Sequence, residues 1–194
     1  MEKRIAQFMA QKTISCGVLV NGKVLSFGYE LLIIAFVGIM LMVVVSCYVH
    51  QPLAWIPFLI GFAPLRTTAG GFHANKQWKC YIVSTCIYAA CLLYASKIVS
   101  VGPVQIVLAA VTAVITWCMA PVEAINKPLS ETKRNKNRLR SIIIVCMDMI
   151  VAIITCLAEI SNVAISLFFL GGISASISLV VAKVINILGK EDTV

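Results

Sequence analysis

Long apolar runs separated by short polar segments limit the folds open to this chain of 194 residues. The runs at 31–49, 142–160 and 163–182 approach the roughly 20 residues that a helix needs to cross a bilayer. Isolated strands cannot satisfy their backbone hydrogen bonds in lipid, whereas helices can. With 60% apolar and 12% charged residues, the composition excludes an ordinary soluble enzyme, a disordered chain and a collagen-like chain. The sequence therefore predicts an all-α polytopic membrane protein, with 1–194 forming a single membrane domain.

We expect six transmembrane helices. Their predicted ranges are 31–49, 53–65, 81–96, 102–121, 142–160 and 163–182. The second range is short and Pro-rich, and at 1.5 Å per residue it barely reaches across about 30 Å of hydrocarbon. It is therefore either a short broken crossing or a re-entrant segment.

The distribution of basic residues separates these two possibilities. If the chain crosses six times with both termini cytoplasmic, 15 of the 16 Lys and Arg residues lie inside, and Lys97 lies outside. Cytoplasmic loops of membrane proteins carry such an excess. A re-entrant second segment would place basic segments on both sides, so the count favours a real crossing. The net charge of +8 then reflects topology, and nucleic acid is not an expected partner.

The N-terminal segment 1–28 is predicted to be an amphipathic interfacial helix followed by a turn region at Gly22 and Gly28. It is too polar for the apolar region of a cleavable signal peptide. Four apolar residues of this segment form a stripe near one helical face: Ile5, Phe8, Met9 and Cys16. Lys12 interrupts this stripe.

The eight cysteines do not form a metal-binding or disulfide pattern. Six of them lie in apolar runs, where a free thiol acts as a small hydrophobic side chain. There is no CxxC, no HExxH and only two histidines, so we expect no zinc site and no cofactor. Cys16 and Cys80 stand instead at the edges of polar segments.

The polar segment 66–79 carries the residues best suited to catalysis. Cys80 opens the third predicted span, where the helix dipole favours an anionic thiolate, and Arg66, Lys76 and Lys79 add positive charge. His73 is the side chain suited to accept the thiol proton near neutral pH. A histidine and a cysteine seven residues apart also recur by chance, so an interfacial His73 and a buried Cys80 thiol remain the alternative.

The spacing of this pair requires a break in the helix. On one continuous helix, His73 and Cys80 would lie about 10 Å apart along the axis, whereas direct proton transfer needs about 3 Å. Gly70 and Gly71 permit an unusual turn, and Asn75 is a candidate cap for the third span. We therefore predict that His73 folds back over the start of that helix.

The order Arg66, Gly71, His73 and Cys80, after two hydrophobic segments, resembles the motif of the accessory gene regulator B (AgrB) family. These are membrane peptidases of Gram-positive quorum sensing. A second match is Ala120-Pro121 with Lys127-Pro128 before a basic loop, and the resemblance covers nearly the whole chain. The chain departs from the pattern at Thr67-Thr68, where many relatives carry more basic or His-rich residues.

The resemblance implies a cysteine endopeptidase in a bacterial cell membrane that acts as a homodimer. Its substrate would be a short propeptide with an amphipathic leader, a core containing Cys or Ser, and an acidic C-terminal tail. The enzyme would remove the tail and close the core into a thiolactone or lactone. His73 would be the base and Cys80 the nucleophile, while Arg66, Gly70, Gly71 and nearby backbone N–H groups would support the motif or the oxyanion.

Other polar residues are candidates for supporting roles. Asn75 and Glu123 are candidates to orient His73. The predicted basic cytoplasmic loop 123–140 either grips the acidic tail or acts only as a topology signal, through Lys127, Lys133, Arg134, Lys136, Arg138 and Arg140. Asp148 lies inside the fifth predicted span, where an ionisable group is a candidate substrate-binding residue. A non-catalytic peptide exporter or membrane scaffold is the alternative function.

Overall fold

The structure, a computed structural model, describes residues 2–15, 21–70, 77–97, 102–122 and 130–191. Within these residues the chain forms seven α-helices and no strand, which confirms the all-α prediction. The helices are α1 (Glu2–Ser15), α2 (Gly22–Tyr48), α3 (Trp55–Thr68), α4 (Gln77–Lys97), α5 (Gly102–Met119), α6 (Glu131–Leu157) and α7 (Val163–Glu191).

Four of the described helices are long and apolar enough to cross a membrane: Gly22–Tyr48, Cys80–Lys97, Glu131–Leu157 and Val163–Leu188. The helix α5 is apolar but shorter. The 14 residues of α3 span about 21 Å at 1.5 Å per residue, less than the hydrocarbon thickness. A multi-pass membrane protein follows from these helices, while the count of six crossings stays a prediction.

The predicted interfacial segment 1–28 is wrong as a single element. The first helix ends at Ser15, and α2 already begins at Gly22 rather than after Gly28. Asn21 is the N-cap of α2, and its side-chain oxygen accepts a hydrogen bond from the Lys23 N–H at 3.0 Å. This cap satisfies a free backbone donor at the helix start, so the helix can begin in the polar part of the chain.

The predicted loop 123–140 is also corrected, because residues from Glu131 onward are helical and continue directly into the span. Glu131 lies in the first turn, where a negative charge complements the helix dipole. The Lys and Arg residues that follow are good helix formers. Helices likewise extend beyond the predicted ranges at Thr68 in α3 and at Glu191 in α7.

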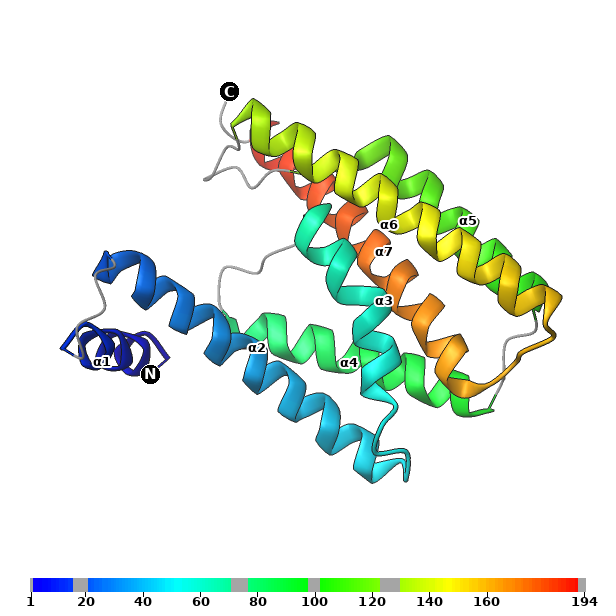
Figure 1. Cartoon of the computed structure of the whole chain (residues 1–194), viewed down its shortest axis with the longest axis horizontal. Helices are drawn as coiled ribbons and strands as arrows, with labels where there is room; N and C mark the ends of the chain where they lie inside the picture. The colour runs from blue at the N-terminus through cyan, green and yellow to red at the C-terminus, as the bar shows by residue number, and fades with distance from the viewer. Residues whose placement is uncertain (1, 16–20, 71–76, 98–101, 123–129, 192–194) are drawn as a thin grey trace.

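The helices α3 and α7 cross closely at the centre of the bundle, as Figure 1 shows. A methyl group on Gly61 would overlap the backbone carbonyl oxygen of Phe168, and one on Gly171 would overlap that of Phe58. Small residues permit such backbone contact between helices in a membrane. Because α7 also packs against α4 and α5, it positions the end of α3 within the bundle.

The remaining helices pack around this centre. The helix α2 lies against α4, where Ser46 and Tyr88 share a buried hydrogen bond, and the Tyr88 ring meets Phe58 of α3 edge to face. The helices α5 and α6 pair along their length, with Thr155 donating to the Gln105 side-chain oxygen at 3.0 Å. Buried polar side chains thus find partners in neighbouring helices.

The first helix lies beside the start of α2 (Figure 1). Ala6 and Ala10 are buried, and the hydroxyls of Thr13 and Tyr29 are 2.8 Å apart. The larger apolar side chains of the predicted stripe stay exposed: Ile5, Phe8 and Met9. The small alanines therefore permit close packing on α2, while larger side chains remain free to meet a membrane surface.

Candidate functional site

Arg66 stands in the last turn of α3, at the end of the bundle where α4 begins and α5 ends. Its Nη1 donates a hydrogen bond to Ser178 Oγ of α7 at 3.0 Å and reaches the Gly70 carbonyl oxygen at 3.5 Å. The guanidinium also forms a side-chain hydrogen bond with the Cys80 thiol of α4. A half-buried cation thus joins three segments that are distant in sequence.

Cys80 lies in the first turn of α4, half-buried beside this guanidinium. The first four N–H groups of a helix lack partners within that helix and carry partial positive charge. The Arg66 charge and the helix start therefore both place positive electrostatic potential around the Cys80 sulfur. His73, Gly71 and Asn75 lie outside the described residues, so the predicted fold-back of His73 stays a prediction.

Gly70 follows the C-terminal end of α3 with a backbone φ of +87°, a conformation that favours glycine. A side chain here would also overlap the backbone carbonyl oxygen of Val122, just beyond α5. The Val122 N–H donates to the Ala69 carbonyl at 2.9 Å. The segment that contains Ala120-Pro121 is therefore joined directly to the segment that leads to His73.

The distribution of charge predicts that the N-terminal part of α6 is cytoplasmic. This part of α6 packs against the end of α3 through Ser141. Ser141 is fully buried, and its hydroxyl is 3.1 Å from Thr68 Oγ1 and 2.9 Å from the Asn137 carbonyl. The part of α6 before Ser141 presents exposed basic residues, which we call the basic arm: Lys133, Arg134, Lys136, Arg138 and Arg140. Lys127 lies outside the described residues.

Asp148 belongs to a different environment from the basic arm. Its side chain is 9% exposed and lies on the buried face of α6, with Val145 and Ala152 on the same face. The carboxyl is therefore inside the bundle, two turns beyond Arg140. Glu123, the candidate His73 orienter, lies outside the described residues.

Ser178 and Val122 are site neighbours that the sequence interpretation did not identify. Val122 follows Ala120-Pro121, so the second match to the family pattern was a usable signal for it. Ser178 lies in an apolar helix, far from any recognised motif, and only its contact with Arg66 distinguishes it. In the described part of the chain, no three His, Cys, Asp or Glu residues gather as metal ligands.

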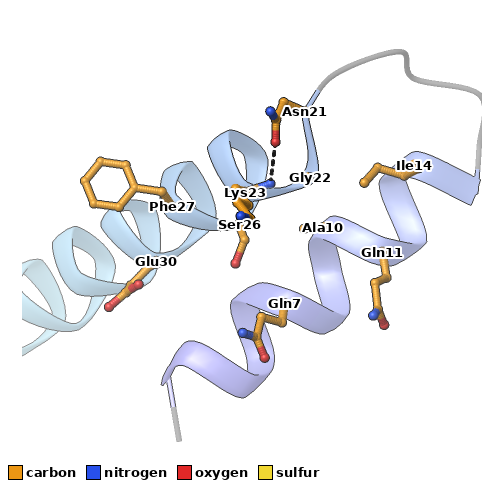
Figure 2. A pocket seen from close by; sticks show the side chains of 10 residues that line it. All are labelled: Gln7, Ala10, Gln11, Ile14, Asn21, Gly22, Lys23, Ser26, Phe27 and Glu30. Atoms are coloured by element: carbon orange, nitrogen blue, oxygen red, sulfur yellow. Dashed lines mark hydrogen bonds between the residues drawn. The ribbon is translucent and has the colours of Figure 1, made fainter.

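A separate hollow lies between α1 and α2, with a volume of about 680 Å³. Figure 2 shows the side chains around it, which come from both helices and from the N-cap of α2. The polar members are Gln7, Gln11, Asn21, Lys23, Ser26 and Glu30. None of the predicted catalytic residues lines this hollow.

A comparison with protein-family models gives a match over nearly the whole chain. The family model described as accessory gene regulator B matches residues 2–182, essentially the whole chain. No curated protein and no solved structure matches the chain. The matched residues include α3, the start of α4 and the basic arm. Because it extends over far more than half of the sequence, the chain belongs to the accessory gene regulator B family.

Proposed function

We propose that this protein is a membrane-embedded cysteine endopeptidase that removes the C-terminal tail of a quorum-sensing propeptide and cyclises the remaining core. The contact between the Arg66 guanidinium and the Cys80 thiol is the observation that carries the proposal. A thiol at a helix start beside a fixed cation has the environment of a reactive cysteine rather than of an inert buried one. Membership of the family supports a role in quorum sensing.

His73 is the proposed base. It follows Gly70 by three residues, and three residues span at most about 11 Å. Gly70 is itself within reach of Arg66, which contacts Cys80. We propose that His73 lies near the thiol, where it would accept the proton and leave a thiolate paired with Arg66.

In the first chemical step, the Cys80 thiolate attacks the carbonyl carbon at the junction of core and tail. The peptide C–N bond then breaks, the imidazolium of His73 protonates the leaving amine, and a thioester joins the core to Cys80. Free backbone N–H groups in the first turn of α4 are suited to stabilise the oxyanion of the tetrahedral intermediate. Arg66 keeps its charge beside the sulfur throughout.

In the second step, a thiol or hydroxyl of the peptide core attacks this thioester. The bond to Cys80 breaks, the ring closes as a thiolactone or lactone, and the proton of the attacking group returns through His73 to Cys80. Attack by a thiol replaces one thioester with another, so little free energy is lost. Water would give a linear acid instead, and a water-poor site at the membrane disfavours that outcome.

The basic arm is the proposed binding surface for the acidic tail. Five exposed cations occur within residues 133–140 of α6, and the hydrogen bond between Ser141 and Thr68 joins this helix to the end of α3. A tail held on the arm would therefore lie near Arg66. Opposite charges on the two partners would guide the encounter.

The proposed topology has six crossings and cytoplasmic termini, and the protein is proposed to act as a homodimer in the cell membrane. The turn between α6 and α7 would lie on the outer side of the membrane, and the basic arm would lie on the cytoplasmic side. Glu159→Cys and Lys133→Cys, each in a variant that lacks the eight native cysteines, test this arrangement with a membrane-impermeant maleimide. The Glu159→Cys position should label in intact cells, whereas Lys133→Cys should label only after permeabilisation. The opposite pattern would reject the topology.

The chemistry is tested with the full-length protein in lipid vesicles and a synthetic propeptide that has an amphipathic leader, a core containing Cys and an acidic C-terminal tail. Cys80→Ala should abolish release of the tail, and His73→Ala should do the same. Cys86→Ala is the matched control, because Cys86 is an exposed thiol six residues further along α4. Mass spectrometry should detect a Cys80-linked acyl intermediate in the wild-type protein.

A Cys80→Ala protein that still released the tail would rule out the cysteine mechanism. A peptide exporter or scaffold needs no nucleophile, so alkylation of Cys80 would leave such a protein active. Retained activity after complete alkylation of Cys80 would thus favour the non-enzymatic function.

A further inference from the structure

The hydrogen bond between Arg66 and Ser178 joins the proposed site to a helix that carries no recognised motif. Ser178 Oγ accepts from Arg66 Nη1 at 3.0 Å, and the two residues are 112 positions apart in sequence. The same guanidinium contacts the Cys80 thiol. Ser178 does not therefore need to touch the sulfur in order to influence it.

A guanidinium at the end of a long side chain needs partners to stay in one place. The Arg side chain has high rotamer entropy, and its planar group presents five donors in a fixed fork. Gly70 holds this group only weakly, because its carbonyl oxygen lies at 3.5 Å. Ser178 provides the shorter contact at 3.0 Å, and it comes from a helix rather than from a turn.

Packing between α3 and α7 fixes the position of this serine. Leu65, next to Arg66, and Ala175, one turn before Ser178, belong to the same buried cluster together with Val145 of α6. About one turn earlier in α3, Gly61 brings the helices into backbone contact. The register of the two helices thus sets Ser178 opposite Arg66 before any substrate binds.

We propose that Ser178 is a positioning residue that holds the Arg66 guanidinium beside the Cys80 thiol. This inference rests on the proposed function of Cys80 as nucleophile. Without the serine hydroxyl, the guanidinium loses this hydrogen bond and spends less time beside the sulfur. A thiolate formed during the reaction is then less well paired, and both alkylation and acyl transfer become slower near neutral pH.

The test measures the rate of iodoacetamide alkylation of Cys80 against pH in the full-length protein in lipid vesicles. Tandem mass spectrometry of the digest separates Cys80 from Cys86, so the exposed Cys86 is an internal control. Ser178→Ala should slow Cys80 alkylation at pH 7 about fivefold and move its rise to higher pH. The rate at Cys86 should not change.

Two further variants separate positioning from a general effect on structure. Ser178→Thr retains the hydroxyl and should keep the wild-type pH profile. Ser174→Ala removes a buried hydroxyl one turn away on α7, which contacts the Leu170 carbonyl and the Cys91 thiol, and should leave the Cys80 profile unchanged. If Ser178→Ala does not fold, the Thr variant is compared with Ser178→Val, which has a similar shape without the hydroxyl.

A double-mutant cycle tests whether Ser178 acts through Arg66. In an Arg66→Met background there is no guanidinium to position, so Ser178→Ala should have no further effect on the Cys80 profile. An equal shift in both backgrounds, or a wild-type profile for Ser178→Ala alone, would overturn the inference. Neither result depends on peptide processing, whereas tail release by Cys80→Ala would reject the proposed function independently.

Discussion

The backbone N–H of Val122 donates a hydrogen bond to the carbonyl oxygen of Ala69 at 2.9 Å. This bond joins the residue after Ala120-Pro121 to the residue before Gly70-Gly71, so two separate parts of the family pattern meet at one point. Arg66 lies one turn before Gly70. The bond therefore also stabilises the turn beside which the guanidinium lies. The predictions below test this connection, the helix packing behind it and the surfaces around it.

Gly70→Ala should destabilise the site locally. The residue has φ of +87°, and an added methyl would overlap the Val122 carbonyl oxygen, so we expect a loss of about 1–3 kcal/mol in the free energy of unfolding. Thermal unfolding in detergent and Cys80 alkylation measure the effect. Gly28→Ala is the control, because its new methyl would meet nothing within 4 Å. Equal stability of the two variants would contradict the proposed role of this turn.

Gly61→Ala should force α3 and α7 apart. The added methyl would overlap the Phe168 carbonyl oxygen, and relief of that overlap costs about 1–3 kcal/mol. Because the same crossing sets Ser178 opposite Arg66, Cys80 alkylation near pH 7 should slow along with the loss of thermal stability. Gly38→Ala in α2 has open space around it and should be neutral or slightly stabilising. A Gly61→Ala protein with wild-type unfolding and alkylation would show that close approach is unnecessary.

Charge reversal on the basic arm should weaken peptide binding without changing the chemistry. With Lys133→Glu and Lys136→Glu together, we expect KM for the propeptide to rise about tenfold at low salt, with kcat nearly unchanged. The wild-type KM should also rise with ionic strength, because exposed charges are screened. Lys23→Glu, an exposed cation at the start of α2, is the control. An unaltered KM in the double variant would leave the arm with a topological role only.

Tyr29→Phe should loosen the contact between α1 and α2. It removes the hydroxyl that lies 2.8 Å from Thr13 Oγ1, a hydrogen bond worth about 1 kcal/mol. Amide hydrogen exchange in α1 should therefore become several-fold faster, while exchange in α6 stays unchanged. Tyr94→Phe, in the exposed part of α4, provides the comparison. If both variants exchange like the wild type, the two helices are held by Ala6 and Ala10 packing alone.

Helical membrane architecture was predictable because it depends on local chemistry. Apolar runs near 20 residues require helices in lipid, and the basic residues around Arg66 and in 133–140 indicate which ends lie together. Helix boundaries were predicted poorly where polar sequence continues a helix, as at Glu131 and Gly22. Lys and Arg do not end a helix, so a change in polarity is not a change in secondary structure.

The residues of the candidate site were also partly predictable from the sequence, because Arg66, Gly70 and Cys80 carry side-chain or backbone properties that are unusual in an apolar chain. Their three-dimensional partners were not. Ser178 and Val122 lie 112 and 52 residues beyond Arg66 and Gly70, in segments with no charge to mark them. In a soluble protein, the polar face of a helix shows which side is buried. In lipid both faces are apolar, so the sequence determined the helices, whereas side-chain packing between α3 and α7 determined which serine meets the arginine beside Cys80.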